Sequence, residues 1–143
     1  TPELSKPRTI LAFDFGLRRI GVAVGQDVTG SASPLGVVAN RSTGMDTAKI
    51  DALLAEWRPT QLVVGMPAHA DGSPSDIQDQ VDGFIEELRT YGLPVDTVDE
   101  RYTSVEAERV LKSARQAGTR GRISKDEIDR AAAVFIAERY LAG

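Results

Sequence analysis

Three acidic residues that are far apart in the sequence each stand at the border of an apolar segment. Asp14 closes the apolar run of residues 10–13, and Glu100 comes just after a second short run, residues 95–98. Asp129 stands in the first turns of the last amphipathic segment, near the margin of its apolar stripe. An ionised carboxylate in such a place is costly unless arginine or a divalent cation compensates it. We therefore expect the three carboxylates to lie close together, although they are 86 and 29 residues apart in the chain.

Carboxylates that converge without histidine or cysteine form a set of hard oxygen ligands. Such a set suits Mg²⁺ or Mn²⁺ better than zinc. The matching chemistry is phosphoryl transfer, in which two ions about 3.5–4 Å apart activate a water and stabilise the departing oxygen. Acids at strand ends also cap helices and pair with arginine, and the pattern alone leaves that structural interpretation open.

The bulk composition is typical of one soluble globular domain. Charged residues make up 27% and hydrophobic residues 41% of the 143-residue chain, which is long enough for a real core. There are no cysteines, which excludes both disulfides and a thiolate metal site. No apolar run approaches the roughly 20 residues that a membrane span needs, so we expect no membrane partner. The chain begins TPELSKPR, which lacks the apolar core of a secretory signal, and we expect a cytoplasmic protein.

The net charge of −4 hides an asymmetry along the chain. Residues 101–125 hold seven basic residues against two acidic ones, whereas residues 44–100 hold twelve acidic residues against three basic ones. A local basic segment can contact phosphates whatever the total charge, although a solvated helix face would have the same composition. The candidate contacts to nucleic acid are Arg18, Arg19, Arg101, Lys112, Arg115, Arg120, Arg122 and Lys125.

Apolar periodicity predicts an α/β fold with a five-stranded mixed sheet and helices on both faces. The first strands should form an antiparallel meander around a tight glycine-containing turn, and the later strands should be parallel because helices join them. The predicted strands are residues 9–15, 19–25, 35–39, 61–66 and 95–98. The predicted helices are residues 47–57, 77–88, 103–114 and 124–140.

Four motifs in this order resemble the YqgF/RuvX family, whose members are described as candidate Holliday-junction resolvases and candidate nucleases of pre-16S rRNA. They are FDFGLRRIGVAVG (13–25), VVGMPAHADGS (63–73), VDERYTSVEAE (98–108) and IDRAAAVFIAERYL (128–141). The resemblance implies a ribonuclease H-like fold in one domain, residues 1–143, with residues 1–8 as a flexible tail. It also implies that Asp14, Glu100 and Asp129 are the catalytic residues and the ligands of Mg²⁺ or Mn²⁺.

The resemblance favours a metal-dependent nuclease that processes the 5′ end of pre-16S rRNA. A resolvase acting on branched DNA is the alternative, and we expect a monomer or weak homodimer because the sequence reserves no long apolar surface for a symmetric dimer. A non-catalytic RNA-binding module and a nucleotide-binding domain of the actin and sugar-kinase type are weaker alternatives. The sequence leaves open whether His69 or Asp126 takes part in catalysis.

Overall fold

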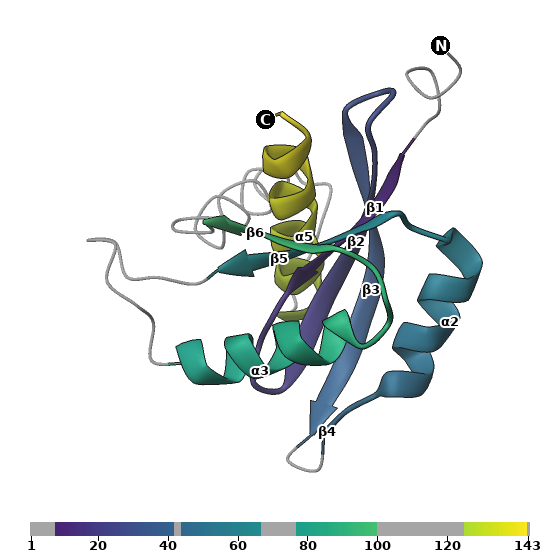
Figure 1. Ribbon diagram of the computed structural model, residues 1–143. Coiled ribbons are helices and arrows are strands. Elements are labelled where there is room, and N and C mark those ends of the chain that lie inside the picture. Colours follow the sequence, from purple (N-terminus) through teal and green to yellow (C-terminus); the bar gives the residue numbers. More distant parts are fainter. Residues whose placement is uncertain (1–7, 42–43, 67–76, 100–124, 143) are drawn as a thin grey trace, which may run out of the picture.

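The computed structural model describes residues 8–41, 44–66, 77–99 and 125–142. Within these residues six strands form one mixed sheet in the order β4-β3-β2-β1-β5-β6 (Figure 1). The strands are β1 (Thr9–Asp14), β2 (Arg19–Gln26), β3 (Ser31–Arg41), β4 (Gly44–Met45), β5 (Gln61–Met66) and β6 (Val95–Asp99). The pairs β1–β2, β2–β3 and β3–β4 are antiparallel, whereas β1–β5 and β5–β6 are parallel. The predicted meander and the predicted parallel strands are both confirmed.

The predicted number of strands was wrong, because β4 was missed. This strand has only two residues, and they pair with Asn40 and Arg41 at the end of β3. Two residues cannot display an alternating pattern, so no periodicity signals such a strand.

Strand β3 also begins earlier than predicted. It starts at Ser31 and passes through Pro34, which lies where the pairing with β2 shifts by one residue between Val22 and Ala23. A proline has no N–H to donate and is tolerated at such an irregularity. The first residues of β3 are small and show no apolar alternation, so the sequence gave no strand signal there. Pairing with β2 holds these residues in an extended conformation.

Three described helices cover the two faces of the sheet. Helices α2 (Thr47–Trp57) and α3 (Gln78–Arg89) pack on one face, and α5 (Lys125–Leu141) packs on the other (Figure 1). The predicted placement of helices on both faces is confirmed. The predicted helix at residues 103–114 lies outside the described residues. None of the described helices is long and apolar enough to cross a membrane.

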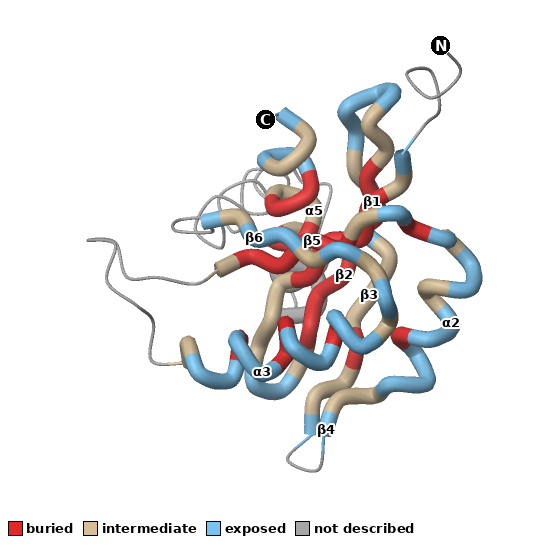
Figure 2. The backbone as a smooth tube through the Cα atoms, in the orientation of Figure 1, coloured by how far each residue is buried: buried red, intermediate tan, exposed pale blue. Residues whose placement is uncertain are grey.

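Alternation along β1 divides the core into two layers. Leu11 and Phe13 belong to the larger cluster under α2 and α3, where the Phe13 ring meets the edge of Phe84 at a centroid distance of 5.7 Å. Ile10 and Ala12 belong to the smaller cluster under α5. All four β1 residues are fully buried, and Figure 2 shows the buried chain concentrated in the central strands. Because successive side chains point to opposite faces, Asp14 belongs to the α5 side.

Helix α5 runs antiparallel to β1. The carboxyl end of α5 lies at the amino end of β1. Leu141 is close to Gly25, because a Cβ built on Gly25 would lie 3.0 Å from Leu141 Cδ1. Gly25 in turn pairs with Ile10 near the start of β1. The helix has 17 residues and so extends about 25 Å, longer than β1 at about 17 Å from Thr9 to Asp14. The first turns of α5 therefore lie toward the carboxyl end of β1.

Candidate active site

The carboxyl ends of the three parallel strands meet at one edge of the sheet. Asp14, Met66 and Asp99 are the last residues of β1, β5 and β6, and the pairs Phe13–Val64 and Met66–Asp99 hold these ends in register. Asp14 is half-buried and follows the fully buried Phe13. The structure thus places an acid at the end of the central strand, on the side that α5 covers.

The turn after Asp14 is held from two sides. On one side the Phe15 ring packs against Phe84 at a centroid distance of 5.2 Å. On the other side Asn40, near the end of β3, donates its side-chain amide to the Gly16 carbonyl at 2.8 Å. The backbone N–H of Asn40 donates to the Arg18 carbonyl at 2.9 Å. Asn40 therefore holds the turn that follows Asp14 through two hydrogen bonds.

Gly16 leaves no room for a side chain in this turn. A Cβ on Gly16 would lie 2.5 Å from the carbonyl oxygen of Arg19, a distance that real Cβ atoms do not show. The close approach brings the chain back into β2, where Gly21 pairs with Asp14. The requirement for glycine here is steric, because the turn brings its own backbone against the Gly16 Cα.

Sequence reasoning missed Asn40. It is a polar residue at the end of a weakly patterned strand, and only the turn that it contacts gives it a role. The signal in the sequence was an amide residue at the end of an extended run. That signal is weak, because asparagine is common wherever an extended run gives way to a turn.

The structure places the other two predicted carboxylates only in part. Asp129 lies in the first turns of α5, where the backbone but not the side chain is described, and it precedes the buried Ala132, Ala133 and Ile136 by three, four and seven residues. Glu100 lies outside the described residues. Among the side chains that the structure describes, no three His, Cys, Asp or Glu residues are grouped to hold a metal ion. The three-carboxylate site stays a prediction.

The predicted phosphate contacts separate into two groups. Arg18 is exposed in the turn after Asp14, and Arg19 begins β2 with its side chain half-buried. Lys125 is the first residue of α5, and Asp126 follows it, both with only the backbone described. The remaining predicted contacts lie outside the described part of the chain: Arg101, Lys112, Arg115, Arg120 and Arg122. His69, whose part in catalysis the sequence left open, also lies outside it.

Comparison with solved structures identifies the fold. The structure of Thermus thermophilus RuvC in complex with a Holliday junction substrate matches with a TM-score of 0.56 at 15% sequence identity, over 94% of each chain. The yeast mitochondrial Holliday junction resolvase Ydc2 matches with a TM-score of 0.55 at 9% identity, over 92% of this chain and 77% of that one. The fold is therefore that of the ribonuclease H-like resolvases, as predicted.

Comparison of sequences identifies the family. A family model described as "RuvX: Holliday junction resolvase" matches residues 8–143. A Burkholderia cenocepacia protein named "Putative pre-16S rRNA nuclease" is 46% identical over 138 residues, which cover 96% of this chain and 91% of that protein. A protein of the same name from Burkholderia multivorans matches with the same identity and coverage. The chain belongs to the RuvX family. It is a nuclease, a hydrolase that acts on the phosphodiester bonds of nucleic acid.

Proposed function

We propose that this nuclease cleaves precursor 16S rRNA during the processing of its 5′ end, at a divalent-cation site built on Asp14. The observation that supports the proposal is the placement of Asp14. It is a half-buried acid at the end of the central strand, on the side of α5 and at the edge where β5 and β6 also end. An acid there can hold a cation beside a substrate that lies across the sheet edge.

The proposed site contains Asp14, Glu100 and Asp129. Glu100 directly follows Asp99, the last residue of β6, and lies outside the described residues; within β6, Asp96 and Val98 face the α5 side. Asp129 belongs to the end of α5 that lies toward Asp14. These three side chains offer only carboxylate oxygens, the donor set that Mg²⁺ and Mn²⁺ prefer.

The cation would activate both the nucleophile and the leaving group, because a bound Mg²⁺ or Mn²⁺ lowers the pKa of the attacking water and stabilises charge on the departing oxygen. The protein supplies position. Asn40 and Gly16 fix the turn beside Asp14 and so fix where its carboxylate stands. In this proposal exposed Arg18 contacts a phosphate next to the scissile bond and helps to align the strand.

The substrate is proposed from the relatives that are 46% identical, since they carry the name of a pre-16S rRNA nuclease. We further propose that the enzyme acts in the cytoplasm, where it would meet an rRNA precursor. Junction DNA is the second candidate, and the description of the family model favours it. Paired cleavage of a four-way junction requires a symmetric dimer, whereas a monomer or weak homodimer suffices for processing of a single RNA strand.

The test compares two substrates and four proteins. Wild type and the variants Asp14→Asn and Asp129→Asn would be incubated with Mn²⁺ and labelled precursor rRNA or labelled four-way junction DNA. Asp79→Asn is the matched control, because Asp79 is an exposed acid on α3, on the opposite face of the sheet. We expect wild type and the control to cleave RNA, and both site variants to fall to the level seen without divalent cation.

Asp14→Asn should also retain the fold. Removing one of several crowded like charges relieves repulsion when no cation is bound, so its thermal midpoint in a chelator should equal or exceed that of wild type. Full nuclease activity in Asp14→Asn would show that the site lies elsewhere. Cleavage of junction DNA alone by wild type would overturn the rRNA substrate and leave the site standing.

A further inference from the structure

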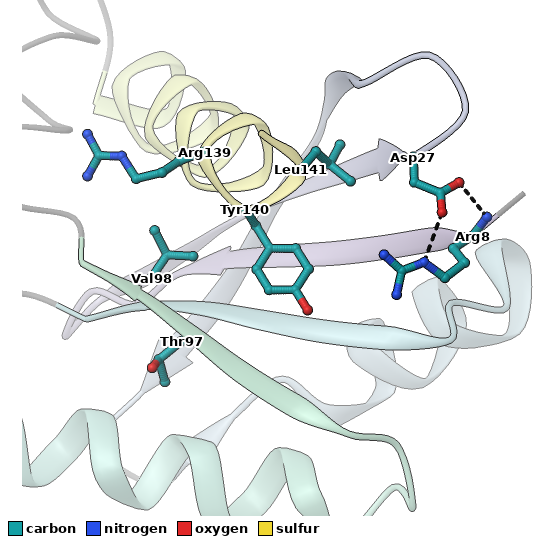
Figure 3. A pocket seen from close by; sticks show the side chains of 7 residues that line it. All are labelled: Arg8, Asp27, Thr97, Val98, Arg139, Tyr140 and Leu141. Carbon is teal, nitrogen blue, oxygen red and sulfur yellow. Dashed lines mark hydrogen bonds and ion pairs between the residues drawn. The ribbon is translucent and has the colours of Figure 1, made fainter. Parts of the chain in front are cut away.

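A pocket lies beside the last turn of α5. It has a volume of about 550 Å³, within the range of small-ligand pockets. Its lining comes from the start of β1, the end of β2, strand β6 and the last turn of α5 (Figure 3). The lining residues are Arg8, Asp27, Thr97, Val98, Arg139, Tyr140 and Leu141.

Tyr140 occupies the centre of this pocket. Figure 3 shows its ring between Val98 on one side and the Arg8–Asp27 pair on the other. The hydroxyl donates to Asp96 Oδ2 at 2.9 Å, which fixes the ring direction. Burial, followed by this hydrogen bond, raises the pKa of Tyr140, so the phenol stays neutral. The pocket thus presents an oriented, half-buried aromatic ring.

Each acid that faces the pocket already has a partner. Arg8 donates its backbone N–H to Asp27 Oδ1 at 2.7 Å and its Nε to Asp27 Oδ2 at 2.8 Å. These bonds hold the pKa of Asp27 below its usual range. Asp96 accepts from the Tyr140 hydroxyl.

Arg8 was predicted to be part of a flexible tail, but its hydrogen bonds to Asp27 hold it in place. Residues 1–7 lie outside the described residues.

Arg139 supplies a second positive charge beside the pocket, while Asp96 keeps its negative charge because the Tyr140 phenol that donates to it is neutral. The Arg139 guanidinium donates to the backbone carbonyl of Asp99, an uncharged acceptor, and it forms no ion pair with any residue in the described part of the chain. Arg8 and Arg139 lie on opposite sides of Tyr140 (Figure 3). The pocket therefore has an aromatic centre with a guanidinium on each side, and the Arg139 guanidinium has no ion-pair partner among the described residues.

This combination matches a nucleotide in an unpaired strand. Single-stranded RNA is recognised by stacking bases on tyrosine and by arginines that follow its phosphates. We propose that the pocket binds one unpaired nucleotide of the RNA substrate, with its base against Tyr140 and its flanking phosphates toward Arg139 and Arg8. The inference rests on the proposed function for the identity of the strand. It adds a second point of contact, on the α5 side of the sheet and beside the last turn of α5.

The position of the pocket explains what such a contact would do. Arg8 directly precedes β1, which Asp14 ends, so the Arg8 side of the pocket lies about the length of β1, roughly 17 Å, from Asp14. Val98 and Arg139, by contrast, extend the pocket toward the carboxyl ends of the strands. A strand that runs from Asp14 to the Arg8 side of the pocket needs more than one nucleotide, so the pocket would favour substrates with several unpaired nucleotides beside the cleavage site. Arg139 also links the pocket to the end of β6 through the Asp99 carbonyl.

The test measures binding without cleavage. A dye-labelled single-stranded oligoribonucleotide from the 5′ precursor region would be titrated with protein in a chelator, and binding followed by fluorescence anisotropy. Tyr140→Leu keeps an apolar side chain against Val98 but removes the stacking ring, and Tyr140→Phe keeps the ring but removes the hydroxyl. Arg139→Gln removes the guanidinium charge that has no ion-pair partner among the described residues, and Arg89→Gln removes an exposed charge on α3 as a control.

We expect Tyr140→Leu to weaken binding by at least about fivefold, the low end of the effect of removing one stacked base. Arg139→Gln should flatten the log–log salt slope by about 0.7, the loss of one phosphate contact to a single strand. Tyr140→Phe and Arg89→Gln should bind like wild type. Equal binding by Tyr140→Leu and wild type, or equal losses in Tyr140→Leu and Tyr140→Phe, would overturn the proposal.

The outcome is separate from that of the proposed function. Binding is measured without divalent cation, so a wild type that fails to cut rRNA would overturn the substrate proposal and leave the comparison of variants intact. Conversely, a wild type that cuts rRNA while Tyr140→Leu binds normally would overturn the pocket alone. Circular dichroism of Tyr140→Leu, checked against wild type, ensures that a loss of binding is not a loss of fold.

Discussion

Replacing Asn40 with alanine should separate the position of Asp14 from the stability of the fold. The substitution removes the 2.8 Å hydrogen bond to the Gly16 carbonyl and leaves the backbone bond from residue 40 to Arg18 in place. A neutral hydrogen bond contributes about 0.5–1.5 kcal/mol, and water can reach the half-buried Gly16 carbonyl. We therefore expect a loss of about 1 kcal/mol, or about 3–4 °C in the thermal midpoint for a chain of this length.

The effect on catalysis should be larger than this loss of stability suggests. Without the amide of Asn40, the turn from Gly16 to Arg18 is held on that side only by the backbone bond, and Asp14 precedes it directly. A misplacement of about 1 Å in a catalytic group can reduce the rate by about a hundredfold. We expect kcat for RNA cleavage to fall at least about tenfold. KM should change much less, because Asn40 itself is not among the predicted substrate contacts.

Gln61→Ala is the matched control. The Gln61 side-chain amide also donates to backbone carbonyls, those of Leu62 at 3.0 Å and Pro94 at 3.1 Å, but at the opposite edge of the sheet from Asp14. Both variants should lose a similar amount of stability by thermal unfolding, and only Asn40→Ala should lose activity. The reasoning is refuted if Asn40→Ala keeps the wild-type kcat, or if both variants lose activity in proportion to their stability.

Three further outcomes are expected. Gly16→Ala places a Cβ 2.5 Å from the Arg19 carbonyl, so the backbone must shift; we expect a loss of about 1–3 kcal/mol in urea unfolding, together with loss of activity, and an unchanged midpoint would contradict the turn geometry. Burial, followed by a hydrogen bond to Asp51, raises the pKa of Tyr91 from 10.0 to about 12, so its stabilising contribution is complete below pH 10 and is lost as the pH rises through about 12. Ultraviolet absorbance should show one fewer late-ionising tyrosine in Tyr91→Phe, and an identical titration would count against this environment. Replacing the three arginines between residues 115 and 123 with alanine should flatten the salt slope of RNA binding by about two to three, and an unaltered slope would mark that segment as a solvated helix end.

The sequence predicted the helices and strands whose apolar residues recur at a regular spacing. Helix α2 and strands β1 and β5 match their predicted ranges within one residue, because each has an apolar pattern bounded by a turn signal. Strand β4 and the first half of β3 were missed because pairing with a neighbouring strand creates them and their own composition does not. Propensity is local, whereas the pairing of Gly44 with Arg41 depends on where the whole strand runs.

The residues of the candidate sites also differ in whether their own sequence segment predicts them. Asp14 was predictable from its own segment of the sequence, because an acid that directly follows an apolar run is unusual. Asn40 and Arg139 are ordinary polar residues in their own segments, and only contacts with distant backbone carbonyls give them roles. Such contacts join residues that are 24 and 40 positions apart, and no local spacing encodes them.

The late position of α5 in the chain has a consequence for synthesis on the ribosome. The sheet face that contains Ile10, Ala12 and Val63 is covered by Ile136 and Ala137, which are translated long after β1, β2 and β5. A nascent chain can pair its strands and cover the opposite face with α2 and α3, but the α5 side stays exposed until residue 137 has left the exit tunnel. Until then the apolar face is open to aggregation or to a chaperone. A nascent chain that has not yet reached α5 also lacks Asp129, one of the three predicted carboxylates.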